Sequence, residues 1–396
     1  MMGREEEIKI LITGDLCPHN RIEELVLESD LKSVFNDFID VFRGNDLNIT
    51  DLECPLTESE AARPKTGPHQ KAHPRCIEIL KHAGIGLVAM ANNHIMDYGA
   101  EGAVETIELC RSAGMGIVGI GHGSGEWRAE SGERRTESGE RSYRDPFVFR
   151  CKGKKVAVLN FADNEFLSVP DSKIQANPLH PVHNYHDIRR AKDENDFVIL
   201  LVHGGNEFYH LPSPRTKELY RYFTDIGADV IISHHTHCFS GYEIYNGKHI
   251  FYGLGNFIYD WPGRINTEWN RGFIVRLKLG DAVDFDIIPL RQGNEIPGVF
   301  HLSGEEKNAF NERISELNSI IADDIRLEAS FNDYCNKVTP MYDAYIEPYF
   351  GKWITALQKR HLFPKLMSRR KRLLLLNIIR CESHREVLLR FLKQYE

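Results

Sequence analysis

The sequence predicts an α/β protein in which helices flank mixed β-sheets, with a helical appendage after them. Up to about residue 300, short β-branched or apolar runs alternate with segments of helical period, which is typical of an α/β domain. Beyond residue 300 the strand-like runs stop and only helix-like segments follow. We therefore expect residues 1–300 to form the main domain and residues 301–396 a C-terminal helical extension.

The candidate strands fall into two groups. The earlier strands are separated by helical segments, and they are Lys9–Thr13, Leu47–Thr50, Leu87–Ala91, Gly116–Ile120, Lys155–Asn160, Phe197–Val202 and Asp229–Ile232. The later strands follow one another closely with turn residues between them, which indicates antiparallel pairing. They are Gly241–Tyr245, His249–Tyr252, Phe273–Leu279 and Val283–Pro289.

Helical periodicity marks two sets of helices. In the main domain we expect helices at Arg21–Arg43, His73–Ala83, Ala100–Ala113, Asp187–Asp193 and Arg215–Ile226. In the extension we expect them at Glu305–Asp324, Lys352–Arg360, Phe363–Arg380 and Ser383–Gln394.

Residues 125–144 differ from both sets of helices, because the motif Glu-Ser-Gly-Glu-Arg recurs there without the apolar positions of a heptad. We expect a disordered, solvated insertion at 125–144.

The composition limits the classes of function. The 49 Lys and Arg residues against 57 Asp and Glu residues give a net charge of −8, so no nucleic-acid partner is expected. The charged N-terminus leads directly into the first strand, and no apolar run approaches the roughly 20 residues that cross a bilayer. We therefore expect a cytoplasmic protein. The eight cysteines contain no C-x-x-C pair, which favours buried thiols over a disulfide framework.

One segment of the extension combines strong positive charge with leucines. Ser368-Arg-Arg-Lys-Arg372 is followed directly by Leu373-Leu-Leu-Leu376. Such a helix can bind a peripheral membrane surface or a protein partner. We favour the plainer interpretation, in which the basic face is solvated and the leucine stripe packs on the main domain.

Residue types that bind metals gather just after five of the candidate strands. Open α/β sheets bind ligands at the carboxyl ends of their strands, so these positions are expected to meet. The five segments are Gly14-Asp15, Asp51-Leu-Glu53, Asn92-Asn93-His94 with Asp97, His203-Gly-Gly with Glu207, and His234-His235-Thr-His237.

The last of these segments is the most specific. Its H-x-H pair, His235 and His237, presents two imidazoles to one side of an extended segment, and neutral imidazole is a preferred ligand for zinc, iron and manganese-type sites. Taken singly, the other segments have plainer interpretations. Asp15 can cap a helix, Glu53 can be an edge-strand charge and His203 can be a hydrogen-bonded core histidine. Their joint occurrence favours a metal site.

Taken in order, these segments and the later Tyr252-Gly-Leu-Gly-Asn256 resemble the CapA (poly-gamma-glutamate capsule synthesis) family. That family is itself similar to calcineurin-like metallophosphoesterases, and the resemblance covers roughly residues 8–290. It implies a calcineurin-like sandwich of mixed β-sheets flanked by helices. It also implies divalent ions, manganese, zinc or iron, whose ligands are Asp15, Glu53, Asn93, His203, His235 and His237.

The resemblance assigns the ligands to two ions that share Glu53. One ion is held by Asp15, Glu53 and His237, the other by Glu53, Asn93, His203 and His235, and His94 lies beside them as a general acid or electrostatic stabiliser. The sequence departs from the phosphoesterase pattern, because Asp-x-His is replaced by Asp15-Leu-Cys17 and the bridging Asp by Glu53. Cys17 can ligate as a thiolate or leave its position weak, so the site holds one ion or two. Further ligands or neighbours are Asp97, Glu207, His234 and Asn256.

Three functional hypotheses follow from these residues. The first is a metal-dependent hydrolase in which an activated water attacks a phosphoester or a related, gamma-glutamyl substrate. The second is a non-catalytic accessory protein that binds an anionic polymer such as poly-gamma-glutamate in capsule synthesis. The third, a structural metal site, is disfavoured because such sites are closed Cys and His tetrads. The expected partner is therefore an anionic small molecule or polymer.

Overall fold

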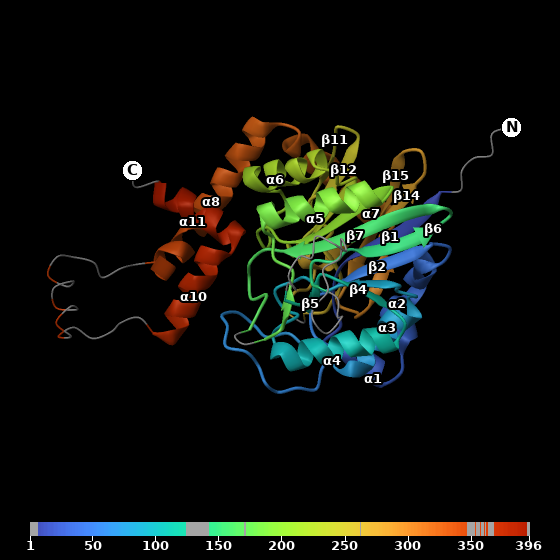
Figure 1. Ribbon diagram of the computed structural model, residues 1–396, viewed down its shortest axis with the longest axis horizontal. Helices are drawn as coiled ribbons and strands as arrows, with labels where there is room; N and C mark the ends of the chain where they lie inside the picture. The colour runs from blue at the N-terminus through green and yellow to red at the C-terminus, as the bar shows by residue number, and fades with distance from the viewer. Residues whose placement is uncertain are drawn as a thin grey trace, which may run out of the picture.

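The computed structural model describes residues 7–123, 142–169, 172–261, 263–346 and 368–393, and the single residues 353, 357, 360 and 362. Two mixed β-sheets pack against each other, and helices cover both outer faces (Figure 1). Further helices lie at one end of the sandwich, opposite the start of the first strand. The α/β sandwich with flanking helices, as predicted from the sequence, is confirmed.

The larger sheet supplies three of the strands that lead to the candidate site. Its strand order is β16-β15-β14-β1-β2-β3-β4, and β13 also pairs with β1. The strands β1 to β4 run parallel, whereas β14, β15 and β16 are antiparallel. The bounds are β1 (Ile8–Cys17), β2 (Leu47–Leu52), β3 (Leu87–Ala89), β4 (Gly116–Val118), β13 (Asn256–Tyr259), β14 (Arg271–Leu279), β15 (Val283–Gln292) and β16 (Val299–His301).

The smaller sheet supplies the histidine-bearing strands. Its order is β11-β12-β10-β9-β7-β6, with β7, β9, β10 and β12 parallel. Because β9 is covered on both faces, it is an unbroken apolar run from Val198 to Val202. The bounds are β6 (Phe147–Cys151), β7 (Lys154–Ala162), β9 (Phe197–His203), β10 (Val230–His234), β11 (Tyr242–Tyr245) and β12 (Lys248–Phe251); β5 (Ile120–His122) and β8 (Ile174–Ala176) form a separate pair.

The helices divide between the two outer faces. Those against the larger sheet are α1 (Arg21–Leu27), α2 (Leu31–Phe35), η1 (Asn36–Phe42), η2 (Pro74–Cys76), α3 (Ile77–His82) and α4 (Gly99–Ser112). Those against the smaller sheet are α5 (Pro181–Glu194) and α6 (Pro214–Asp225), and a short turn, η3 (Glu268–Asn270), precedes β14. Apolar residues of the facing sheet surfaces, such as Ile10 and Leu200, form the main core between the sheets.

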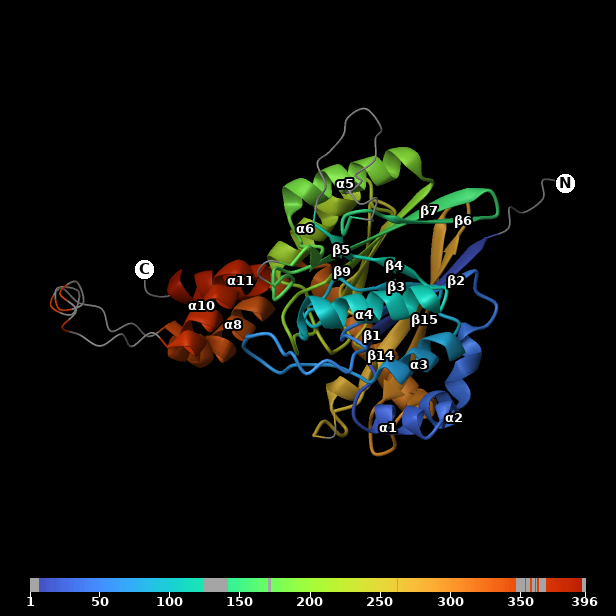
Figure 2. The ribbon, with the colours of Figure 1, turned by 60° about the horizontal axis from the view of Figure 1, so that its bottom comes forward.

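The C-terminal helices are α7 (Gly304–Ile321), α8 (Asp324–Ile346), α10 (Arg369–Arg380) and α11 (Glu382–Lys393). α7 joins the main core through Phe310 and Leu317. The other three share a small core of their own and lie together beside the sandwich (Figure 2). Among the described helices, none is both long enough and apolar enough to cross a membrane.

Several elements differ from the sequence-based expectation. The single helix expected at Arg21–Arg43 is three short helices, because Ser29 and Asn36 adopt positive φ angles of 65° and 49° and Asp30 caps a new helix by accepting a hydrogen bond from Ser33 N at 3.1 Å. The later strands are not all antiparallel, since β12 runs parallel to β10 and β13 to β1. The long helix α8 was not predicted at all.

Two of the expected segments fall largely outside the described residues. Residues 125–141 of the expected insertion lie outside them, but Ser142, Tyr143 and Arg144 are described and buried. Arg144 Nε donates to Asp187 Oδ2 at 2.7 Å, so these three residues belong to the packed domain and are not solvated. The expected helix at 352–360 and residues 363–367 also lie outside the described part, apart from single residues.

The close approach of backbone to Gly14 can be tested. A methyl group on Gly14 would lie 1.9 Å from the Gly255 carbonyl oxygen, directly before Asp15. We expect Gly14→Ala to lower the free energy of unfolding by about 3 kcal/mol or more. The control Gly280→Ala, whose methyl group meets nothing closer than 3.4 Å, should change it by less than about 1 kcal/mol. Equal denaturation midpoints for the two variants would contradict this packing.

Candidate metal centre

The candidate centre lies where the carboxyl ends of strands from both sheets meet. β1 and β2 bring Asp15 and Asp51 into register as neighbours, and Glu53 follows directly after β2. β9 ends at His203, and His235 comes immediately after β10. All five side chains are buried, with at most 4% of their surface exposed. The geometry therefore combines carboxylates from one sheet with imidazoles from the other.

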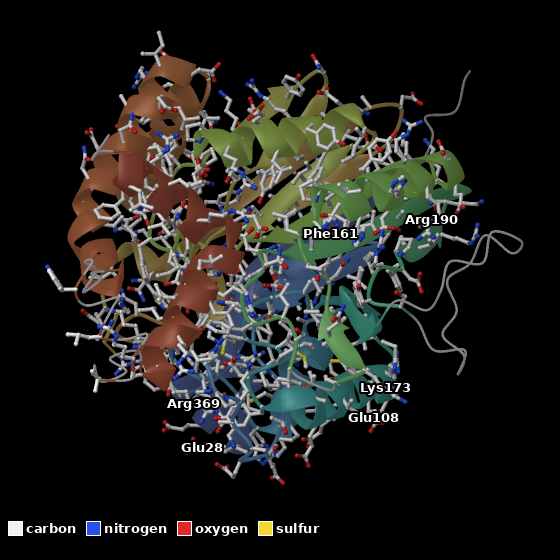
Figure 3. The ribbon with its side chains drawn as sticks, turned by 60° about the vertical axis from the view of Figure 1, so that its left-hand side comes forward. Glu28, Glu108, Phe161, Lys173, Arg190 and Arg369 are labelled. Carbon is white, nitrogen blue, oxygen red and sulfur yellow. The ribbon has the colours of Figure 1, made fainter. Side chains whose placement is uncertain are left out.

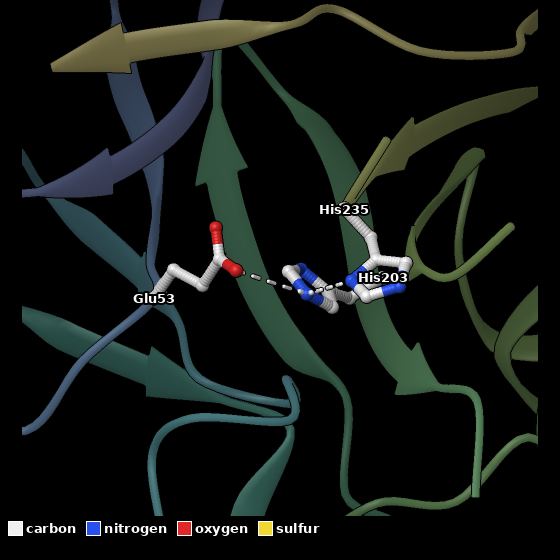
Figure 4. A group of neighbouring side chains, drawn as sticks. All are labelled: Glu53, His203 and His235. Carbon is white, nitrogen blue, oxygen red and sulfur yellow. Dashed lines mark hydrogen bonds and ion pairs between the residues drawn. The ribbon is translucent and has the colours of Figure 1, made fainter. Parts of the chain in front are cut away.

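Glu53, His203 and His235 form one group that could hold a metal ion (Figure 4). The nearest ring nitrogens of the two histidines, His203 Nε2 and His235 Nδ1, are 3.2 Å apart. Glu53 Oε1 lies 3.7 Å from His203 Nε2. A second group overlaps the first through Glu53 and His203 and adds Asp15 and Asp51; in each group the ligand atoms lie within 4.8 Å of one another.

The state of Glu53 is the strongest indication of a cation. Both of its carboxyl oxygens are buried without any hydrogen-bond partner. Burial, with Asp15 and Asp51 as neighbours, raises the pKa of Glu53 well above its ordinary value. Ligands about 2.0–2.1 Å from a tetrahedral ion stand roughly 3.3–3.5 Å apart, close to the 3.5 Å between Glu53 Oε1 and His237 Nε2. The residues present thus fit a divalent ion.

His203 is held in an orientation that suits a ligand. We place the ring proton on Nδ1, as the donor to Asp51 Oδ2 at 2.8 Å, and this leaves the lone pair of Nε2 facing Asn93 Oδ1 at 3.0 Å. Two acceptors face each other there, an arrangement that a cation between them would stabilise. Burial lowers the pKa of His203 to about 3, so its ring is neutral near pH 7. Burial raises the pKa of Asp51 to about 7. Through its contact with Nδ1, Asp51 fixes the orientation of the His203 ring.

His235 has a similar arrangement on its other side. Burial lowers the pKa of His235 to about 4, so it also offers a neutral ring. Its Nε2 faces Glu165 Oε2 at 3.9 Å, while its Nδ1 faces His203. Glu165 is itself fixed by Asn377, whose Nδ2 donates to Glu165 Oε1 at 2.7 Å, and by His384 at 3.5 Å. The C-terminal helices therefore support this wall of the centre.

Asp15 and His237 complete the cluster. Burial raises the pKa of Asp15, but its contact with His237 and the neighbouring imidazoles outweigh burial and lower that pKa to about 2. His237 Nδ1 lies 3.4 Å from Asp15 Oδ2 and 3.0 Å from Asn256 Oδ1. The H-x-H pair is not extended as expected, because His235 and His237 have positive φ angles of 89° and 54°. Both rings reach the centre through this strained turn.

Three further predicted residues lie beside the cluster. His234 Nε2 lies 2.9 Å from the Thr13 carbonyl oxygen, and Cys17 Sγ lies 3.6 Å from His19 Nδ1. Neither residue belongs to a described ligand group. Burial raises the pKa of Cys17 well above its ordinary value, which favours a thiol over a thiolate. Glu207 lines the adjoining pocket.

The centre adjoins a pocket of about 260 Å³ that contains His94. His94 Nδ1 lies 2.7 Å from Asp97 Oδ2, and we place the proton on Nδ1 as the donor, which leaves Nε2 available to a ligand. Lys65 also donates to Asp97, through its Oδ1. Burial lowers the pKa of His94, so its ring is neutral. Asn93 and His237 line the same pocket, which links it to the cluster.

Sequence reasoning did not assign roles to three residues of this centre. Asp51 lies two residues before Glu53 at the end of a predicted strand, and this spacing, which places both carboxylates on one face, is a usable signal. Lys65 and Glu165 come from loops without periodicity, and no sequence feature marked them.

Comparison with known proteins gives the family. A family model described as "Bacterial capsule synthesis protein PGA_cap" matches residues 9–261. The chain belongs to this family. The resemblance to CapA noted in the sequence is thereby confirmed, and CapA proteins are in the metallophosphoesterase-like superfamily, which implies divalent metals.

Curated relatives of this PGA_cap protein are similar over most of their length. "PGA biosynthesis protein CapA" of Bacillus subtilis (strain 168) is 26% identical over 289 residues, which is 72% of each chain. "Capsule biosynthesis protein CapA" of Bacillus anthracis is 28% identical over 294 residues, 72% of this chain and 67% of the relative. A "Probable polyglutamine synthesis accessory protein" of Mycobacterium tuberculosis (strain ATCC 25618 / H37Rv) is 24% identical over 268 residues, 63% and 66% respectively.

The orienting role of Asp51 leads to a test on metal affinity. Asp51→Asn replaces the carboxyl acceptor of the His203 Nδ1–H with a weaker amide acceptor, so we expect metal affinity to fall by about 10- to 100-fold. Calorimetric titration with Mn²⁺ or Zn²⁺ at fixed pH measures the change. The control Asp40→Asn alters a carboxylate that is 71% exposed and should bind metal normally. Unchanged affinity in the Asp51 variant would contradict the assigned role.

Proposed function

We propose that this PGA_cap protein is a metal-dependent hydrolase that acts on an anionic substrate, a phosphoester or a gamma-glutamyl compound. The observation that carries the proposal is the unpaired Glu53 carboxyl group, buried among Asp15, His203 and His235 beside a pocket that holds His94. Such a cluster is the chemistry of a divalent ion, and the open pocket leaves room for a substrate.

The donor set argues for a catalytic rather than a structural ion. Structural sites are closed tetrads of Cys and His, whereas this cluster offers several carboxylate oxygens. His237 and Asn93, which contact the cluster, also line the pocket. A substrate in the pocket would therefore lie against the ligands themselves.

The protein's own residues would divide the work as follows. Divalent ions, when bound, polarise a substrate oxygen and lower the pKa of water. His94 exchanges a proton at Nε2 with the substrate, while Asp97 holds its Nδ1 in place. Lys65 and Arg264 line the pocket and attract an anionic group. Aromatic side chains, Phe166, Phe208 and Trp269 among them, form its walls and limit access of water.

One finding favours a second function, that of an accessory protein that binds an anionic polymer. The Mycobacterium tuberculosis relative is named as a synthesis accessory protein, and the Bacillus relatives are named for PGA and capsule biosynthesis. In that function the same cluster would hold cations that bind the carboxylates of the polymer, and no bond would be hydrolysed. The basic C-terminal helix would then contact a further partner.

Variants of His94 separate chemistry from metal binding. We expect His94→Ala to keep its metal content but to lower kcat by about 10²- to 10⁴-fold, because proton transfer is lost. Glu53→Gln and His203→Ala should lose both metal and activity. Elemental analysis and steady-state kinetics measure the two properties. His186→Ala, an exposed histidine on α5, is the matched control, and an equal loss of activity there would sink the assignment.

Metal removal and a substrate panel decide between the two functions. Dialysis against a chelator should abolish hydrolysis of phosphomonoesters, phosphodiesters or gamma-glutamyl peptides, and added Mn²⁺ or Zn²⁺ should restore it. Full activity in metal-free protein would overturn the hydrolase mechanism. Tight binding of poly-gamma-glutamate without any turnover would support the accessory function.

A further inference from the structure

A second cavity lies between the C-terminal helices and the main domain. It has a volume of about 590 Å³ and is lined by α10, by the loop around Arg63 and by the loop that contains Phe166. Figure 2 shows α10 beside the long loop that follows β2. Figure 3 labels Arg369 at the start of α10 on this face of the molecule. We refer to this cavity as the α10 groove.

The α10 groove is strongly and unusually basic for this acidic protein. Arg63, Arg369 and Arg380 line it, and none of the described lining residues is a carboxylate. Within the described part of the chain, none of the three forms an ion pair. Burial lowers the pKa of Arg63, although the charge of Asp97 partly opposes this shift, and repulsion from the nearby Arg380 adds to it. Three cations that form no ion pair among the described residues favour an anionic occupant.

Two local features also favour an anionic occupant of the groove. Arg63 Nε is buried without a hydrogen-bond partner, although its Nη1 donates to the Phe166 carbonyl oxygen at 2.7 Å. Arg369 stands in the first turn of α10, which contains no acidic residue. A cation at that helix end opposes the helix dipole. An anion bound in the groove would relieve both unfavourable features.

The groove also has apolar walls between its charges. Leu373, Leu376 and Phe166 line it together with the arginines, and Leu376 is 47% exposed. Carboxylates on an acidic peptide are separated by methylene groups, which would pack against such side chains. Polyphosphate has no apolar groups for these walls, and the net charge of −8 disfavours nucleic acid. The pattern therefore suits a chain of carboxylates.

We propose that the α10 groove binds an acidic peptide chain through Arg63, Arg369 and Arg380 and directs its end past Phe166 to the metal centre. The direction is given by Phe166, which lines both this groove and the pocket of His94. Lys65 Nζ and Arg63 Cζ lie 5.2 and 5.6 Å from the centre of its ring. Delivery to the centre rests on the proposed hydrolase function, whereas binding in the groove does not.

Binding is measured first, independently of turnover. Fluorescein-labelled oligo-glutamate, alpha-linked and gamma-linked, is titrated with the full chain by fluorescence anisotropy. We expect Arg369→Gln/Arg380→Gln to weaken binding at least tenfold and to reduce its dependence on salt, because two charge pairs are lost. Leu376→Glu, which places a carboxylate in the groove at an exposed position, should weaken binding similarly. The matched control is Arg43→Gln, an arginine whose side chain is 76% exposed and paired with Asp40.

The outcomes separate the groove from the hydrolase. The groove variants should keep the metal content of the parent chain and its turnover of a small ester such as p-nitrophenyl phosphate, while KM for an oligo-glutamate substrate rises. Unchanged oligo-glutamate affinity in both groove variants, or tighter binding of polyphosphate of equal charge, would overturn the proposal even if hydrolysis persists. If the parent chain hydrolyses nothing but binds oligo-glutamate, and the groove variants lose that binding, the hydrolase function fails while the proposed role of the groove is supported.

Discussion

The structure depends on an electrostatic constraint: three carboxyl groups, those of Asp15, Asp51 and Glu53, are buried together at the seam between two sheets. Burying like charges in a medium of low polarity is costly unless counter-charges are present. His203 and His235 from the opposite sheet are neutral because burial lowers the pKa of each ring, so they cannot supply that charge, but they can supply lone pairs. A divalent ion answers both needs at once, and it would join the two sheets at their carboxyl ends.

Much of this centre was predictable because its ligands follow apolar strands. The runs before Asp15, Asn93, His203 and His235 fix strand ends, and parallel strands place those ends at one edge. The remaining parts carried no periodic signal. Lys65 and Glu165 come from loops, and the break near Ser29 depends on a backbone conformation that helical periodicity does not register.

Backbone strain is concentrated around the pocket. Positive φ angles between 54° and 89° occur at four residues there, His235, His237, Phe166 and Phe208. Residues other than glycine rarely adopt such angles. Two of them carry candidate ligands and two carry aromatic walls of the pocket. Packing of the sheets on either side offsets the free-energy cost of these strained turns.

The contacts of the Asp163–Glu165 loop have a bearing on protein engineering. Ser383 donates to Asp163 Oδ2 at 2.5 Å and Asn377 to Glu165 Oε1 at 2.7 Å, so helices at the far end of the polypeptide brace a loop that borders His235. The family match ends at residue 261, yet a shortened or grafted version cut there would leave these two acids unsupported. The smallest portable unit therefore includes α10 and α11.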